Sequence, residues 1–111
     1  EQLRCLAGDD VQIIAKVESR QSLDNLAGIL EAADAILIDR GDMGREVAIE
    51  YLPFVQKKVI AEANAVGVPV YVATNLLESM MVNPRPTRAE ANDVINTLID
   101  GADGLVLAAE T

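Results

Sequence analysis

The segment Ile13-Ile14-Ala15-Lys16-Val17-Glu18 has the character of a buried β-strand that ends in two opposite charges. Successive side chains of a strand point to opposite faces, so Lys16 and Glu18 are predicted to share one face. A lysine and a carboxylate placed in this way are neighbours. They form either a simple ion pair at a strand end or a site in which Glu18 holds a cation while Lys16 neutralises an adjacent anion.

Three further apolar runs, at residues 35–38, 68–73 and 105–109, are also predicted to be strands. Their side chains do not alternate between polar and apolar, and helical segments separate them. This pattern is typical of a parallel sheet covered by helices. The predicted fold class is therefore α/β, built from consecutive βα units that form part of a TIM-type barrel. A small flavodoxin-like open sheet is the structural alternative.

Helical periodicity and capping residues place the helices between these strands. Ser22 is predicted to cap a helix that ends near residue 32, and Gly67 is expected to follow the longest helix, at about 49–66. One or two helical turns are expected within 76–81. The spacing of Thr87 and Glu90 fits a capping box for a last helix that ends near residue 101. That helix is predicted to bury a stripe made of Val94, Ile95, Leu98 and Ile99.

The composition limits the chemistry that is available to this chain. Its 111 residues include 18 acidic and 9 basic side chains, a net charge of −9 that disfavours nucleic acid and anionic membrane surfaces as partners. No apolar run approaches the roughly 18 residues that a bilayer-spanning helix needs, so a soluble protein is expected. Cys5 cannot form an internal disulfide, and histidine is absent. Carboxylates, lysines and hydroxyls must therefore carry any chemistry, and a bound metal should be hard and oxygen-liganded, such as Mg²⁺.

Polar residues cluster at the carboxyl ends of the four predicted strands, where ligands bind in α/β folds. Glu18 and Asp42 could together offer two carboxylate oxygens to one Mg²⁺. Gly41 and Gly44 flank Asp42 and would let backbone N–H groups approach an anion closely. The strand-end residues are Lys16, Glu18, Arg40, Asp42, Thr74, Asn75, Glu110 and Thr111, whereas Asp10, Asp34 and Asp103 lie at the other strand ends, as turn residues or caps.

Several of these segments together resemble successive motifs of the pyruvate kinase family, in its order and at its spacing. The resemblance runs from Ile13 almost to the end of the chain, and its proline-rich part is the most specific. The motifs are Lys16-Val17-Glu18, Asp39-Arg40-Gly41-Asp42-Met43-Gly44, the segment 73–80, the proline-rich segment 83–90, and the segments 100–104 and 108–111.

The resemblance implies that residues 1–111 are the second half of a catalytic (β/α)8 barrel, its last four strands, without the lid and regulatory domains. The family transfers a phosphoryl group from phosphoenolpyruvate to ADP and forms pyruvate and ATP. Lys16 would then stabilise charge on the phosphoryl group and the enolate. The implied cofactors are Mg²⁺ or Mn²⁺, with K⁺ in the full-length protein, and the implied setting is a cytoplasmic homo-oligomer.

The remaining roles follow from the same resemblance. Glu18 and Asp42 would bind the divalent metal, the backbone at Gly41 and Asp42 would hold the substrate carboxylate, and Thr74 would lie beside the substrate. Arg40, Asn75 and Glu110 are weaker candidates for the same site. These roles agree with the chemistry, because phosphoryl transfer depends on positioning and charge neutralisation rather than on a histidine base.

The sequence departs from the family pattern in three places. Asp39 stands where a small residue is usual, Asn75 replaces glutamine, and Ala108-Ala109 replaces Ser-Gly. Strand parity predicts that Asp39 lies on the face opposite Asp42, although parity is loose at a strand end. A non-catalytic relative and a phosphoenolpyruvate/pyruvate-type lyase barrel therefore stay open as alternatives. Four βα units cannot close an eight-stranded barrel, so the isolated segment is expected to be inactive and to self-associate through its open edges.

Overall fold

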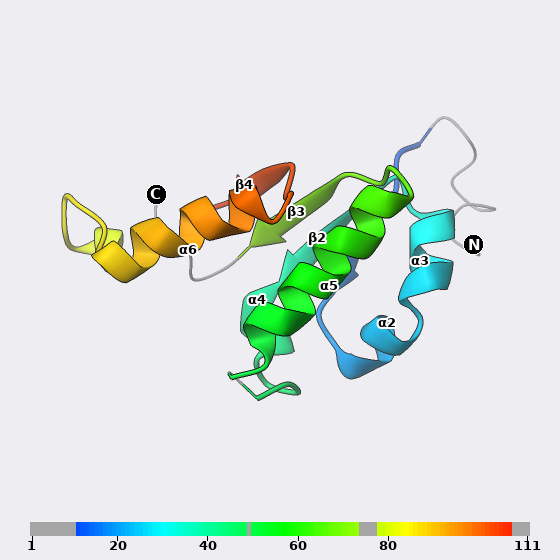
Figure 1. Ribbon diagram of the computed structural model, residues 1–111, viewed down its shortest axis with the longest axis horizontal. Helices are drawn as coiled ribbons and strands as arrows, with labels where there is room; N and C mark the ends of the chain where they lie inside the picture. The colour runs from blue at the N-terminus through cyan, green and yellow to red at the C-terminus, as the bar shows by residue number, and fades with distance from the viewer. Residues whose placement is uncertain (1–10, 49, 74–77, 108–111) are drawn as a thin grey trace.

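The four predicted strands form one parallel sheet. The computed structural model describes residues 11–48, 50–73 and 78–107. In it the strands follow one another in chain order, as β1 (Ile14–Val17), β2 (Ala35–Asp39), β3 (Val70–Ala73) and β4 (Gly104–Val106) (Figure 1). A (β/α)8 barrel adds its strands in this sequential order, whereas a flavodoxin-like sheet places its first strand between the second and third. The α/β prediction is confirmed, and the flavodoxin-like alternative is wrong.

The helices between the strands are shorter and more broken than periodicity predicts. The single helix expected after β1 is two helices that meet at Asn25, and the first has Ser19 and not Ser22 as its N-cap. Ser22 Oγ accepts from the Ser19 N–H at 3.0 Å, and Ser19 Oγ accepts from the Ser22 N–H at 3.1 Å, which closes a capping box. The helical elements are α2 (Arg20–Asp24), α3 (Leu26–Ala32), α4 (Arg40–Met43), α5 (Leu52–Ala65), the 3₁₀ turn η1 (Glu78–Met81) and α6 (Arg88–Ile99).

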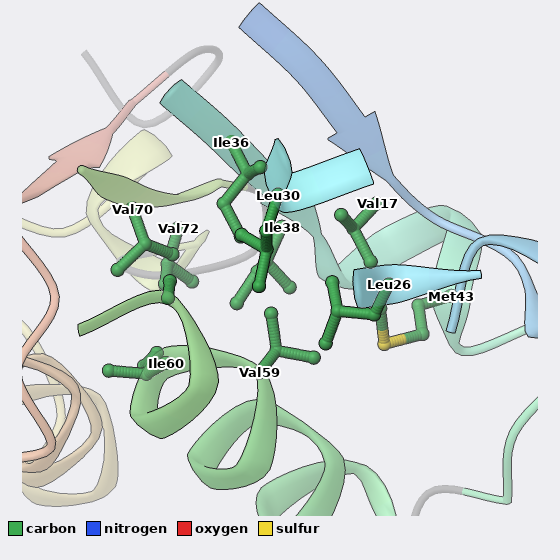
Figure 2. Close-up of a cluster of buried hydrophobic side chains, with 11 residues drawn as sticks. Val17, Leu26, Leu30, Ile36, Ile38, Met43, Val59, Ile60, Val70 and Val72 are labelled. Atoms are coloured by element: carbon green, nitrogen blue, oxygen red, sulfur yellow. The ribbon is translucent and has the colours of Figure 1, made fainter. Parts of the chain in front are cut away.

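The core lies on one face of the sheet, between the strands and the helices α3 and α5 (Figure 2). Alternate strand residues point into it, and the strand register aligns Val17 with Ile38 and Ile38 with Val72. The buried side chains of the cluster are Val17, Leu26, Leu30, Ile36, Ile38, Met43, Val59, Ile60, Ala63, Val70 and Val72. Full burial of a side chain of the Val, Leu, Ile or Met type contributes about 1.5–3 kcal/mol, so this layer fixes which strand residues face away from the helices.

The opposite face of the sheet is open, and it carries Lys16. Ile14, which shares that face, is 59% exposed, and Lys16 pairs in register with the half-buried Leu37. Val106 on the other edge strand is 43% exposed. Self-association through these edges stays a prediction. Among the described residues, no helix combines the length and the apolar character that crossing a bilayer requires.

Helix α6 begins with the predicted Thr87–Glu90 capping box, but the prediction of its buried stripe is wrong. The residues at that stripe are half-buried or exposed, and Thr97 is the buried residue of the helix. Asp93, Thr97 and Asp100 follow helical spacing and form the side that faces the rest of the protein. The misassigned residues are Val94, which is half-buried, and Ile95, Leu98 and Ile99, which are 56%, 45% and 74% exposed.

Polar contacts hold this inward side of α6. Arg40 Nη1 and Nη2 each donate to a carboxylate oxygen of Asp93 at 2.8 Å. Gln56 Nε2 on α5 donates to Thr97 Oγ1 at 3.1 Å, and Lys57 pairs with Asp100. The apolar side of the helix lies opposite, because an amphipathic helix that docks through its polar side must turn its apolar stripe outward.

Two aspartates join the strands in pairs at their amino ends. The Asp34 N–H donates to the Ile13 carbonyl at 2.8 Å, while Asp34 Oδ2 accepts from the Ile13 N–H at 2.7 Å. Asp103 makes the same two bonds with Val70, both at 2.8 Å. Residues 33–38 (ADAILI) and 102–107 (ADGLVL) also resemble one another in sequence, and through these aspartate clamps each segment enters its strand by the same contact with the preceding strand.

Candidate functional site

Lys16 lies at the carboxyl end of β1 between two carboxylates. Its Nζ is 3.0 Å from Glu18 Oε2 and 3.3 Å from Asp39 Oδ2, and its side chain is 51% exposed on the open face of the sheet. Contact with the Glu18 carboxylate, and then with that of Asp39, raises the pKa of Lys16 above its ordinary value. The lysine is therefore a fixed positive charge at the strand end, next to the carboxylate that the sequence predicts as its neighbour.

Asp39, the last residue of β2, connects this lysine to the segment that follows. Its side chain is 11% exposed, and its Oδ1 accepts from the Asp42 N–H at 3.2 Å as the N-cap of α4. Burial raises the pKa of Asp39, but the Asp42 N–H and the Lys16 ammonium outweigh it, and the pKa is lowered overall. Asp39 is thus a buried carboxylate that stays ionised because both of its oxygens have partners.

The parity argument that separated Asp39 from Asp42 is wrong. The backbone turns into α4 directly after Asp39, and this single turn returns Asp42 to the side of the sheet on which Lys16 lies. Glu18, Asp39 and Asp42 each place a carboxylate oxygen within 4.8 Å of the others. The predicted metal ligands Glu18 and Asp42 therefore come together, and Asp39 lies beside both.

The three carboxylates have the chemistry of a cation site. The negative charge of Asp39, followed by burial and by the contact with Glu18, raises the pKa of Asp42. Glu18 Oε2 is shielded from solvent and has no hydrogen-bond donor of acceptable geometry among the described residues, although Lys16 Nζ is near it. Crowded carboxylate oxygens of this kind fit a hard divalent cation such as Mg²⁺ or Mn²⁺, which prefers oxygen ligands.

The remaining predicted site residues do not contribute a side chain to the carboxylate cluster in the part of the chain that the structure describes. Gly41 lies within α4, and the Asp42 N–H, one of the donors expected at the substrate carboxylate, donates to Asp39. Arg40 is not brought into the carboxylate cluster, since its guanidinium is 17% exposed and makes the bidentate pair with Asp93 on α6. The predicted site residues Thr74, Asn75 and Glu110 lie outside the described residues.

Sequence reasoning missed two contributors to this region, Asp39 and Asp93. Asp39 stood out only as a departure from a family pattern, yet an aspartate three residues before Asp42 at a strand-to-helix junction is a recognisable N-cap signal. Asp93 carried no local signal, because its partner Arg40 is 53 residues away in the sequence.

A sequentially ordered parallel sheet with helices against one face and charged groups at its carboxyl ends defines a segment of a (β/α)8 barrel. Comparison with known proteins names the family. The family model for the pyruvate kinase barrel domain matches residues 2–111, and this chain belongs to the pyruvate kinase family.

Individual relatives agree with this assignment. Over 104 residues the chain is 48% identical to the pyruvate kinase of Clostridium acetobutylicum, and 94% of the chain and 22% of that protein are covered. Over the same length it is 50% identical to the pyruvate kinase of Dictyostelium discoideum and to pyruvate kinase 2 of Saccharomyces cerevisiae, with 94% of the chain and 20% and 21% of those proteins covered. The chain therefore spans about a fifth of the length of these relatives.

Proposed function

We propose that the parent protein, meaning the full-length protein in which this segment acts, transfers a phosphoryl group from phosphoenolpyruvate to ADP. The proposal rests on one observation. Lys16 contacts Glu18 and Asp39, and these two carboxylates lie beside Asp42, at the carboxyl end of a barrel sheet. The segment alone is proposed to be inactive, because it spans about a fifth of its relatives and carries one part of such a site. The parent is further proposed to act in the cytoplasm and to require K⁺.

The proposed reaction breaks the phosphorus–oxygen bond of phosphoenolpyruvate and forms a new one to the terminal oxygen of ADP, and the released enolate takes up a proton to become pyruvate. Glu18 and Asp42 would hold Mg²⁺ or Mn²⁺, which supplies positive charge to the phosphoryl oxygens when bound. Lys16 would neutralise negative charge on the phosphoryl group and on the enolate oxygen. The protein thus contributes position and electrostatics, which are the main requirements of phosphoryl transfer.

Two other functions have some support. Lys16 is already paired with two carboxylates, and Asp39 adds a negative charge beside the proposed site of an anionic substrate. Both features favour a non-catalytic relative that keeps the site for binding alone. A lyase barrel that enolises pyruvate with Mg²⁺ would use the same carboxylates, but it accounts less well for the proline-rich segment 83–90.

The test is a lactate-dehydrogenase-coupled assay of the parent protein with phosphoenolpyruvate, ADP, Mg²⁺ and K⁺. Lys16→Met should fold normally and lose about 10²–10³-fold in turnover, the usual effect of removing one preorganised charge from a transition state. Lys57→Met is the matched control, because Lys57 is 57% exposed and pairs with Asp100 on α6, outside the carboxylate cluster.

Each outcome selects among the three functions. Turnover that survives in Lys16→Met would refute the phosphoryl-transfer proposal. Enolisation of pyruvate without ADP phosphorylation would favour the lyase. Bound Mn²⁺ without activity in the wild-type parent would favour the non-catalytic relative.

A further inference from the structure

Lys16 and a bound cation would compete for the same carboxylate. Glu18 Oε2 is the oxygen nearest to Lys16 Nζ, at 3.0 Å, and it is also the shielded oxygen without a hydrogen-bond donor among the described residues. A cation bound at that oxygen would repel the Lys16 ammonium and so weaken the Lys16–Glu18 pair. If a divalent cation engages Glu18, Lys16 needs another counter-ion to keep its position.

Asp39 is placed to be that counter-ion. Its Oδ2 is 3.3 Å from Lys16 Nζ, and its side chain is 11% exposed, far less than that of Glu18 at 39%. Its other oxygen, Oδ1, accepts from the Asp42 N–H at 3.2 Å. One buried carboxylate therefore joins the lysine to the turn that carries a proposed metal ligand.

We propose that Asp39 is a positioning residue that takes over Lys16 when a divalent cation occupies Glu18 and Asp42, and so keeps the lysine charge beside the metal. The proposal rests on the proposed function, because it assigns Asp39 a role toward the same metal and the same lysine. In this proposal Asp39 acts through Lys16 and the Asp42 turn rather than as a metal ligand, because its Oδ2 faces Lys16 and its Oδ1 accepts from the Asp42 N–H.

This role predicts that Asp39 and Lys16 act on the metal as a unit. Without the charge of Asp39, Lys16 stays on Glu18 and opposes the cation there. Loss of the Asp39 charge also weakens cation binding through the electrostatic field alone, but that effect does not depend on whether Lys16 is present. A direct ligand would lose at least as much affinity in the Lys16→Met background, because no lysine would then contact its oxygen. The effect of losing the Asp39 charge, measured with and without Lys16, therefore distinguishes a positioning role from a purely electrostatic role and from direct ligation of the metal.

The experiment is a double-mutant cycle on Mn²⁺ affinity, measured from the electron paramagnetic resonance signal of free Mn²⁺. The proteins are the wild-type parent, Asp39→Asn, Lys16→Met and the double variant. Asparagine keeps an oxygen for the Asp42 N–H and replaces the charged oxygen that faces Lys16 with a neutral amide nitrogen. Asp39→Asn should weaken Mn²⁺ binding by about tenfold or more with Lys16 present, a loss typical of an outer-shell partner, and by several-fold less in the Lys16→Met background.

A second measurement tests the lysine itself. At saturating Mn²⁺, Asp39→Asn should still lower kcat in the coupled assay while the KM for ADP changes little, because a displaced Lys16 affects the reacting phosphoryl group. A purely structural role would leave the cycle additive and kcat unchanged once the variant is folded and loaded with metal.

The outcomes are distinct from those of the proposed function. Equal losses of Mn²⁺ affinity in both backgrounds would overturn the role of Asp39, even if Lys16→Met abolishes turnover and phosphoryl transfer stands. A non-additive cycle in a parent that makes no ATP from phosphoenolpyruvate would support the Asp39–Lys16 link and refute the proposed function. Failure of the wild-type protein to bind Mn²⁺ would overturn both.

Discussion

Replacing Asp93 with alanine should loosen helix α6 from the rest of the fold. Asp93 forms a bidentate pair with Arg40, with both N–H···O distances at 2.8 Å, and the two side chains are 34% and 17% exposed. The variant would leave a mostly buried guanidinium without its carboxylate. The apolar stripe of α6 faces outward and cannot compensate for that loss.

The expected cost lies between two limits. Breaking a fully buried pair by removing one partner costs about 3–5 kcal/mol, whereas an exposed pair is worth about 0.2–1 kcal/mol. The exposure of Asp93 places this pair between them, so the free energy of unfolding should fall by about 2–3 kcal/mol. With a urea m-value of about 1.5 kcal/mol/M, typical of a small domain, the midpoint should move down by between 1 and 2 M, roughly.

The assay is equilibrium urea unfolding followed by far-ultraviolet circular dichroism, with Lys58→Met as the control. Lys58 lies on α5 with an exposed side chain and takes part in no ion pair among the described residues, so its loss should cost less than about 0.5 kcal/mol. Equal midpoints for the two variants would refute the reasoning that burial of the Arg40 pair sets its strength. A double variant that also replaces Arg40 with methionine should recover part of the loss, because the guanidinium that lost the Asp93 carboxylate is then removed as well.

Two further changes test the backbone contacts. Asp103→Ala should lower the free energy of unfolding by about 1–3 kcal/mol, because the N–H of the fully buried Val70 loses its side-chain acceptor. Asp34→Ala removes the more exposed clamp and should cost about 1 kcal/mol or less. Similar losses for the two variants in urea unfolding would contradict this reasoning. Gly101→Ala should cost about 1–3 kcal/mol, since Gly101 has φ +111° and a methyl group there would meet the Asn64 side chain; an unchanged melting temperature would rule that strain out.

The sheet and the location of the site could be predicted from the sequence for simple reasons. Four apolar runs separated by helical periodicity permit few arrangements other than a parallel sheet, and the carboxyl ends of such strands converge. Strand alternation predicts that Lys16 and Glu18 are neighbours, the strand-end rule adds Asp42, and the structure places Glu18 next to both. Short-range capping signals also served well at Thr87, where the Thr87–Glu90 box is present.

The errors arise where tertiary contacts override local pattern. Helical periodicity at Ile95, Leu98 and Ile99 identifies an apolar side of α6 but not what it faces, and the long-range bonds of Asp93 and Thr97 turn that side outward. Ser19 and Ser22 are both capable caps, and only the three-dimensional capping box distinguishes them. The role of Asp39 depends on one turn of α4, which a two-residue alternation cannot anticipate.

The aspartate clamps connect the strands at the end of the sheet opposite the candidate site. Asp34 and Asp103 close the strand pairs at their amino ends, while Lys16 and its carboxylate partners occupy the carboxyl end of β1 and the turn after β2. Substitutions at one end of the sheet should therefore have little effect on the contacts at the other end. Selection could change the residues at the carboxyl ends, as the aspartate at position 39 illustrates, while the clamps keep the strands in register, and in an engineered barrel the same separation would let new side chains be placed at the carboxyl ends of an unchanged sheet.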